Sequence, residues 1–128
     1  MRTVRRLAPP LLLMAANAWV SHRALPVGLT HGSDKIAHFL LYALLAALWV
    51  RALAPREAAG ARMPLRGAVL AAILVCAAWG VVDEIHQSFV PGRDASPGDV
   101  VADTLGGVAG AFAAARAAAR GHTEDHHA

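Results

Sequence analysis

The chain has 128 residues, of which 56% are hydrophobic and only 16% are charged. This length gives room for one domain, and a soluble domain of this size would need far more polar surface, so the composition indicates an integral membrane protein. The net charge of +3 does not indicate nucleic-acid binding, because nine of the twelve basic residues flank apolar runs and no nucleic-acid motif is present. Cys76 is the single cysteine, so it offers neither a disulfide nor a zinc motif and is expected to be a packing residue.

The first apolar run covers residues 7–20 and is extended by residues 21–25. Pro9 and Pro10 suit the start of a helix, where a missing backbone N–H costs little. A cleaved signal peptide is the alternative, because two arginines precede a leucine-rich core and Ala-Asn-Ala at residues 16–18 resembles a cleavage site. We favour a retained membrane helix.

The second and third runs have clearer boundaries. The second covers residues 36–53, with Ser33 as an expected N-cap and Asp34 as an acid that complements the helix dipole in the first turn. The third covers residues 65–82 and continues through residues 83–89 to a Pro-Gly turn at residues 91–92.

The fourth run begins at Ser-Pro-Gly-Asp, residues 96–99, which has the spacing of a capping box and places proline at the first helical position. It continues through Ala115, although two aspartates and several glycines make it the weakest membrane helix by hydropathy. Gly106 and Gly110 are four residues apart, so they predict a face on which another helix backbone approaches closely.

Together the four runs predict an all-α, integral membrane four-helix bundle, with residues 1–120 as one domain and residues 121–128 as a disordered tail. Arginines set its orientation, because basic residues are enriched in cytoplasmic loops. Nine of the twelve basic residues would lie on one side of the membrane and three on the other. This predicts that both termini and the loop at residues 55–64 are cytoplasmic, and that the loops near residues 22–33 and 89–96 are outside. The basic residues expected outside are Arg23, Lys35 and Arg93.

Polar side chains lie at helical spacing near the outer ends of three runs, and ionisable groups set into membrane helices indicate a functional site. Asp34, His38 and Tyr42 share one face of the second run. We expect a deeper layer containing His38, Asp83 and Asp103. A shallower layer would contain Asp34, Glu84, Gln87, Asp99 and Arg93.

This outer end holds six acids, including Asp94, against three bases, so some acids must be protonated, paired or metal-bound. No spacing resembles a known metal loop, and we expect no metal or cofactor. Structural alternatives exist for Asp99 as a helix cap and for Lys35 as a chain that extends to the interface. Trp79 lies one turn below Asp83 and is expected to wall the site.

Three stretches resemble the VanZ family of small bacterial membrane proteins. They are DKIAHF at residues 34–39 with Tyr42, DEIHQSFVPGR at residues 83–93, and DVVADTLGG at residues 99–107 with Gly110. The resemblance implies a four-helix, multi-pass protein of the bacterial cytoplasmic membrane. It also implies a link to resistance against the glycopeptide teicoplanin, through the member for which the family is named. The family commonly has Asn where this chain has Asp103, so the role of Asp103 stays open between an ion and a neutral hydrogen-bonding group.

Our leading functional hypothesis is a non-catalytic envelope protein whose outer pocket binds an envelope lipid, an amphiphile or a glycopeptide-related ligand. Membrane lipids, and a second copy of the chain, are the expected partners. The expected binding residues are Asp34, His38, Asp83, Glu84, Gln87, Arg93, Asp99 and Asp103.

The alternative is an intramembrane hydrolase or transferase that acts on a prenyl- or phosphate-bearing lipid. His38 or His86 would be its general acid or base, Asp83 or Glu84 the partner, and Arg93 a clamp for phosphate. No nucleophile motif supports this hypothesis. A proton-coupled carrier ranks third, because all the ionisable groups gather on one side instead of near the midplane.

Overall fold

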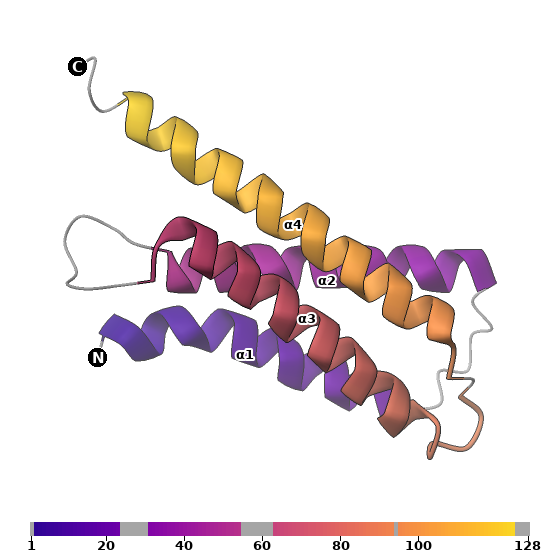
Figure 1. Cartoon of the computed structure of the whole chain (residues 1–128). Coiled ribbons are helices and arrows are strands. Elements are labelled where there is room, and N and C mark those ends of the chain that lie inside the picture. Colours follow the sequence, from indigo (N-terminus) through magenta and orange to yellow (C-terminus); the bar gives the residue numbers. More distant parts are fainter. Residues whose placement is uncertain (1, 24–30, 55–62, 94, 125–128) are drawn as a thin grey trace.

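The computed structural model describes residues 2–23, 31–54, 63–93 and 95–124, and all of their regular secondary structure is helical. The four helices are α1 (Arg2–Ser21), α2 (His31–Leu53), α3 (Leu65–Gln87) and α4 (Pro97–Glu124) (Figure 1). This confirms the predicted all-α fold with four helices. Within the described ranges, α2, α3 and α4 are long and apolar enough to cross a membrane. Helix α1 is not among them, because arginines, prolines and Asn17 lower its hydropathy.

Helices α2 and α3 form the centre of the molecule, with α1 packed against both on one side and α4 packed against both on the other. In the described part of the chain, α1 and α4 do not touch each other. Helix α1 begins and α4 ends at one end of the bundle. The opposite end gathers the ends of α1 and α3 and the beginnings of α2 and α4 (Figure 1). We call this opposite end the polar end. Its location at the outer face of the membrane stays a prediction.

The core consists of one large aromatic ring among small side chains. Tyr42, Leu45 and Val50 of α2 are almost fully buried against Ala72 and Cys76 of α3 and Ala111 of α4. The Cys76 thiol makes a weak contact of 3.8 Å with the Tyr42 carbonyl oxygen, which agrees with the expected packing role. Large apolar side chains are exposed on the outer faces of the helices, as a hydrocarbon surrounding requires. They include Leu40, Leu44, Leu70, Leu74, Leu105 and Phe112.

Glycines bring α4 into backbone contact with its neighbours. A Cβ on Gly106 would collide with the carbonyl oxygen of Phe39, and one on Gly110 would collide with the carbonyl oxygen of Ala43. The predicted small-residue face is therefore present, and it packs against α2. On the side facing α3, a Cβ on Gly107 would lie 2.9 Å from the Cβ of Cys76.

Three helix boundaries differ from the sequence-based expectations. Helix α1 begins at Arg2, so Pro9 and Pro10 lie inside it and do not mark its start. Helix α2 begins at His31, which places Ser33 within its first turn and rules out Ser33 as the N-cap. In both cases polar residues before the apolar run continue the helix, and hydropathy alone does not detect them. Helix α4 extends past Ala115 to Glu124 and includes residues 121–124 of the expected tail.

The start of α4 agrees with the prediction. Pro97 is the first residue of α4, and the Ser96 hydroxyl accepts a hydrogen bond of 3.2 Å from the backbone N–H of Gly98. Ser96 is therefore the N-cap of α4.

The substitution Gly110→Ala tests the close contact between α2 and α4. The added methyl group must push the two backbones apart, and overpacking of this kind costs about 1–3 kcal/mol. We expect a lower midpoint of thermal unfolding for Gly110→Ala in detergent. Ala109→Leu, at the exposed neighbouring position, serves as the control and should unfold near the wild-type temperature. Equal stability of Gly110→Ala and wild type would contradict the contact.

Candidate functional site

The polar end contains all the buried polar side chains that the structure describes. They come from all four helices and form two neighbouring groups. The first group, the His38 cluster, consists of Asp34, Lys35, His38, Glu84, Ser96, Asp99 and Asp103. The second, the Asp83 pocket, is lined by Ala18, Trp19, His22, Trp79, Val82, Asp83 and His86. The buried polar residues are Ser21, His38, Asp83, Glu84, Gln87, Asp99 and Asp103.

A buried hydrogen bond between α2 and α4 forms the base of the His38 cluster. Nδ1 of His38 lies 2.9 Å from Oδ1 of Asp103, and both side chains are more than nine-tenths buried. With Asp103 ionised, its carboxylate can only accept, and the imidazole then donates from Nδ1. Its Nε2 is then directed to the other side of the ring. The ring of Tyr42 stacks one turn below His38, with centroids 6.4 Å apart.

Asp103 fits at this depth because Gly80 of α3 lies opposite it. A Cβ on Gly80 would lie 2.7 Å from Oδ2 of Asp103, so any other residue at position 80 would displace the carboxylate. Oδ2 of Asp103 is buried and has no hydrogen-bond partner in the described part of the chain. Only one of the two carboxylate oxygens is therefore satisfied, which makes this an expensive position for an acid.

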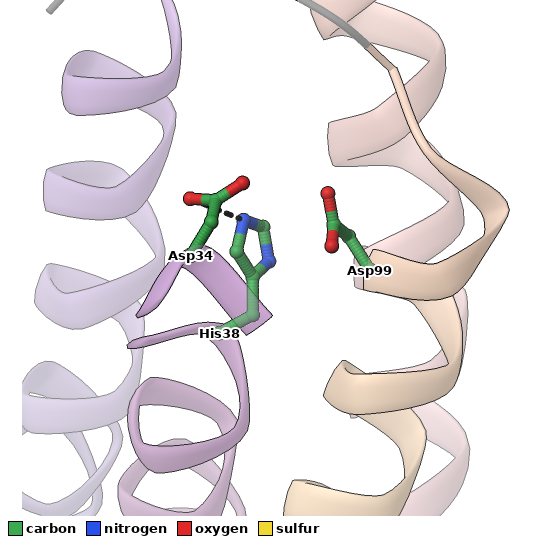
Figure 2. Close-up of side chains that lie close together, drawn as sticks. All are labelled: Asp34, His38 and Asp99. Carbon is green, nitrogen blue, oxygen red and sulfur yellow. Dashed lines mark ion pairs between the residues drawn. The ribbon is translucent and has the colours of Figure 1, made fainter. Parts of the chain in front are cut away.

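Two further carboxylates flank the imidazole of His38. Figure 2 shows the ring between Asp34, on the same helix, and Asp99, on α4. Nε2 of His38 lies 4.0 Å from Oδ1 of Asp34. One potential metal-binding atom from each of the three residues lies within 4.8 Å of the other two. Asp34 and Asp99 are both in the first turns of their helices, where the helix dipole favours negative charge.

Lys35 provides the cation of this cluster. Its Nζ donates to Oδ1 of Asp99 at 2.8 Å and lies 3.4 Å from Oγ of Ser96. The Lys35 side chain is 43% exposed, whereas that of Asp99 is 3% exposed. Lys35 therefore joins the start of α2 to the start of α4, and its extension to the membrane interface stays a prediction.

Glu84 joins the end of α3 to the start of α4. Its Oε2 accepts a hydrogen bond of 2.6 Å from the backbone N–H of Ser96. In a capping box Asp99 would take this bond, so Glu84 replaces Asp99 in that role and leaves Asp99 to Lys35. Oε1 of Glu84 is buried and has no partner in the described segments. The electrostatic neighbours of this carboxylate include Asp99, His38 and Asp103.

Asp83 lies on the other side of α3, at the contact with α1. Its Oδ2 accepts hydrogen bonds of 3.0 Å from the Ser21 hydroxyl and 3.0 Å from Nε2 of Gln87. Beside it is an open pocket of about 430 Å³, with Trp19 and Trp79 among its walls. Trp79 thus has the predicted position. Its Nε1 is buried without a hydrogen-bond partner in the described segments.

Two histidines complete the rim of the Asp83 pocket. Nδ1 of His22, on the turn after α1, lies 3.2 Å from Nε2 of His86, on α3. Their rings are tilted, with centroids 5.3 Å apart. Next to them the guanidinium of Arg23 lies 3.8 Å from the centre of the Trp19 ring, a cation–π contact. Of the sequence-based candidates, His86 therefore pairs with another histidine and not with Asp83 or Glu84.

The structure brings most of the predicted site residues to the polar end. It arranges them as the His38 cluster and the Asp83 pocket, whereas the sequence predicted a deeper and a shallower layer. His38 and Asp103 are in contact, whereas the hydrogen bonds of Asp83 go to α1 and to its own helix. Among the described residues, the Arg93 side chain makes no hydrogen bond or ion pair with these acids, and its role as a phosphate clamp stays a prediction. Asp94 lies outside the described residues.

The sequence did not reveal the roles of Ser21 and His22, or the contacts of Lys35 with Ser96 and Asp99. Lys35 offered a signal, because it lies near the start of the second run and Asp99 lies near the start of the fourth, at the same predicted end of the bundle. Ser21 and His22 offered a weaker one, because they end an apolar run at the predicted outer side.

Comparison with known proteins identifies the family. The model of the VanZ/LLP1 family matches residues 7–118 of the chain. This range covers nearly the whole sequence and includes most of α1 and both groups of polar residues, so the chain belongs to the VanZ/LLP1 family. No curated protein and no solved structure gives a significant match.

The ion pair between Lys35 and Asp99 can be tested by a double-mutant cycle. Lys35→Met leaves the buried Asp99 without its cation, and we expect lower thermal stability. Asp99→Asn in the same chain should recover part of this loss, with a coupling of about 0.5–3 kcal/mol, as is typical of residues in one ion-pair network. The measurement is thermal unfolding of four purified proteins in detergent. Strictly additive effects would mean that the two side chains do not interact.

Proposed function

We propose that this VanZ/LLP1 family member binds an envelope lipid or another amphiphile in the Asp83 pocket. The observation that carries the proposal is the composition of this pocket, which places two tryptophans and Val82 next to an acid and two histidines at one end of membrane-spanning helices. An amphiphile has the same division into an apolar body and a polar head. Pockets of about 300–1,000 Å³ that are mainly apolar, with a few polar groups, are typical of small-molecule sites.

The polar groups of the pocket favour a head group that carries hydroxyl or amine donors. Asp83 accepts hydrogen bonds, and an uncompensated carboxylate repels a phosphate. The nearest described cation, Arg23, is over the Trp19 ring. We therefore place the donors of the head group at Asp83 and its acceptors at the His22–His86 pair.

The orientation of the chain gives this binding a consequence for the cell. The arginine distribution supports an orientation with the polar end at the outer face of the bacterial cytoplasmic membrane. A protein that holds an envelope amphiphile there would change the access of glycopeptides to the cell surface. This supports a role in teicoplanin susceptibility, which the family name suggests.

Catalysis in the membrane is the second candidate function, and one observation favours it. The Asp103 carboxylate fixes the tautomer of His38 and leaves Nε2 available for proton transfer, the arrangement that orients general bases in many enzymes. The partner of the base would be Asp103, whereas the sequence pattern predicts Asp83 or Glu84. The side chains of Ser21, Ser88, Ser96 and Cys76 make hydrogen bonds elsewhere, and the reaction considered for this candidate is activation of water. Turnover of an envelope lipid that is lost in His38→Gln would favour this candidate.

Trp19→Ala tests lipid binding with little risk to the fold, because Trp19 is 60% exposed. Loss of the aromatic wall should reduce the amount of the co-purifying lipid about tenfold, which corresponds to about 1.4 kcal/mol. Lipids are extracted from the purified protein and quantified by mass spectrometry.

Phe112→Ala is the matched control, because Phe112 is a similarly exposed aromatic residue on α4, away from the pocket. It should retain the wild-type lipid. The same lipid content in Trp19→Ala, Phe112→Ala and wild type would contradict binding in the Asp83 pocket.

A further inference from the structure

We propose that Asp34, His38 and Asp99 bind a divalent first-row transition-metal ion, of which Zn²⁺ is the simplest probe. The three ligand atoms already lie within 4.8 Å of one another. Two ligands at about 2.0–2.1 Å from a tetrahedral ion are about 3.4 Å apart, so rotations of two aspartate side chains would close the site. Asp34 and Asp99 come from the first turns of two different helices, and Asp34 is partly exposed, which provides an entry path.

His38 is oriented as a metal ligand requires. Metal-binding histidines usually donate their other ring N–H to a carboxylate or carbonyl, which fixes the tautomer and orients the ring. The Asp103 carboxylate receives Nδ1–H at 2.9 Å, and Nε2 is the nitrogen that lies toward Asp34. This contact exists independently of the two acids beside the ring, and Asp34 lies on the side of the ring that carries Nε2.

With all four of its carboxyl groups ionised, the His38 cluster carries an excess of negative charge that a further cation would offset. Four carboxyl groups, those of Asp34, Glu84, Asp99 and Asp103, surround the Lys35 ammonium and one imidazole. Even a protonated His38 would leave two negative charges in excess, and Arg93 does not contribute a contact among the described residues.

A second observation points to an absent ligand. Glu84 is 7% exposed, and its Oε1 is buried with no hydrogen-bond partner in the described part of the chain. Asp99 and His38 are among the ionisable neighbours of this carboxylate. A bound cation, or water attached to it, would satisfy an oxygen that is otherwise costly to bury.

The ligand types select the metal. One imidazole nitrogen and two carboxylate oxygens suit Zn²⁺ and its neighbours, whereas Mg²⁺ and Ca²⁺ prefer oxygen ligands alone. Lys35 holds Oδ1 of Asp99, so the ion would use Oδ2 or displace the ammonium. Three protein ligands leave at least one coordination position for water or an oxygen of a bound molecule. The site is separate from the Asp83 pocket, and the proposal does not depend on lipid binding.

The experiment uses the full chain, purified without an affinity tag that binds metal. His122, His126 and His127 near the C-terminus are replaced by Gln in every protein, because these residues could bind metal weakly. After treatment with a chelator and dialysis, each protein is titrated with Zn²⁺ by calorimetry, and the bound metal is measured by elemental analysis. A parallel titration uses Mg²⁺.

The informative variants are Asp34→Asn, which removes a partly exposed ligand, and Asp103→Asn, which keeps an acceptor for Nδ1–H but removes its charge. We expect one Zn²⁺ per wild-type chain and no comparable Mg²⁺ binding. Asp34→Asn should raise the Zn²⁺ dissociation constant at least about tenfold, and Asp103→Asn by about 10–100-fold, the range for partners of a metal-binding histidine. Circular dichroism verifies that both variants keep their helices.

The matched control is His22→Gln, which disrupts the other histidine pair of the polar end and should bind Zn²⁺ as the wild type does. Absence of stoichiometric Zn²⁺ binding to the wild type would overturn the proposal. So would unchanged affinity in Asp34→Asn and Asp103→Asn, or loss of the ion in His22→Gln, which would assign binding to the histidine pair.

Discussion

The backbone contact between α2 and α4 is the constraint on which the polar end depends. At Gly106 and Gly110 the absence of side chains allows α4 to touch the carbonyl oxygens of α2. One turn closer to the polar end, this proximity places Asp103 within hydrogen-bond distance of His38. Gly80 gives the same carboxylate room on the side of α3. Because a carboxylate and an imidazole are expensive to bury separately, their contact in turn favours the close approach of the helices.

The division of the polar end into two groups gives this small protein two separate chemical environments. Around His38, acids and one lysine from three helices form a charged cluster with little apolar surface. Around Asp83, aromatic rings from α1 and α3 border an open pocket. Helix α3 separates the two, with Glu84 facing one and Asp83 facing the other. For a VanZ/LLP1 protein, we propose ligand binding in the pocket and cation binding in the cluster, and neither proposal requires the other.

Hydropathy predicted the helices well, because a membrane helix needs a long apolar run and the boundaries of α3 follow from such a run. It also placed the polar residues at one end, because the direction of each helix follows from the order of the spans. It did not predict how they pair. Asp83 and Glu84 are neighbours in sequence, but a rotation of about 100° per residue directs them to different sides of α3. That rotation is set by packing against α1 and α4, and no pattern within α3 reveals it. The starts of α1 and α2 were missed because polar residues extend both helices beyond their apolar runs.

The proton on the His38 ring is the most direct test of the contact between α2 and α4. Nuclear magnetic resonance of metal-free protein with ¹⁵N-labelled histidine identifies which ring nitrogen carries a proton, and the signal is assigned by its absence in His38→Gln. In the wild type we expect a proton on Nδ1 of His38 that exchanges slowly with water. In Asp103→Ala this proton should be absent from Nδ1 or exchange rapidly. A neutral His38 protonated at Nε2, with a signal unchanged in Asp103→Ala, would contradict it.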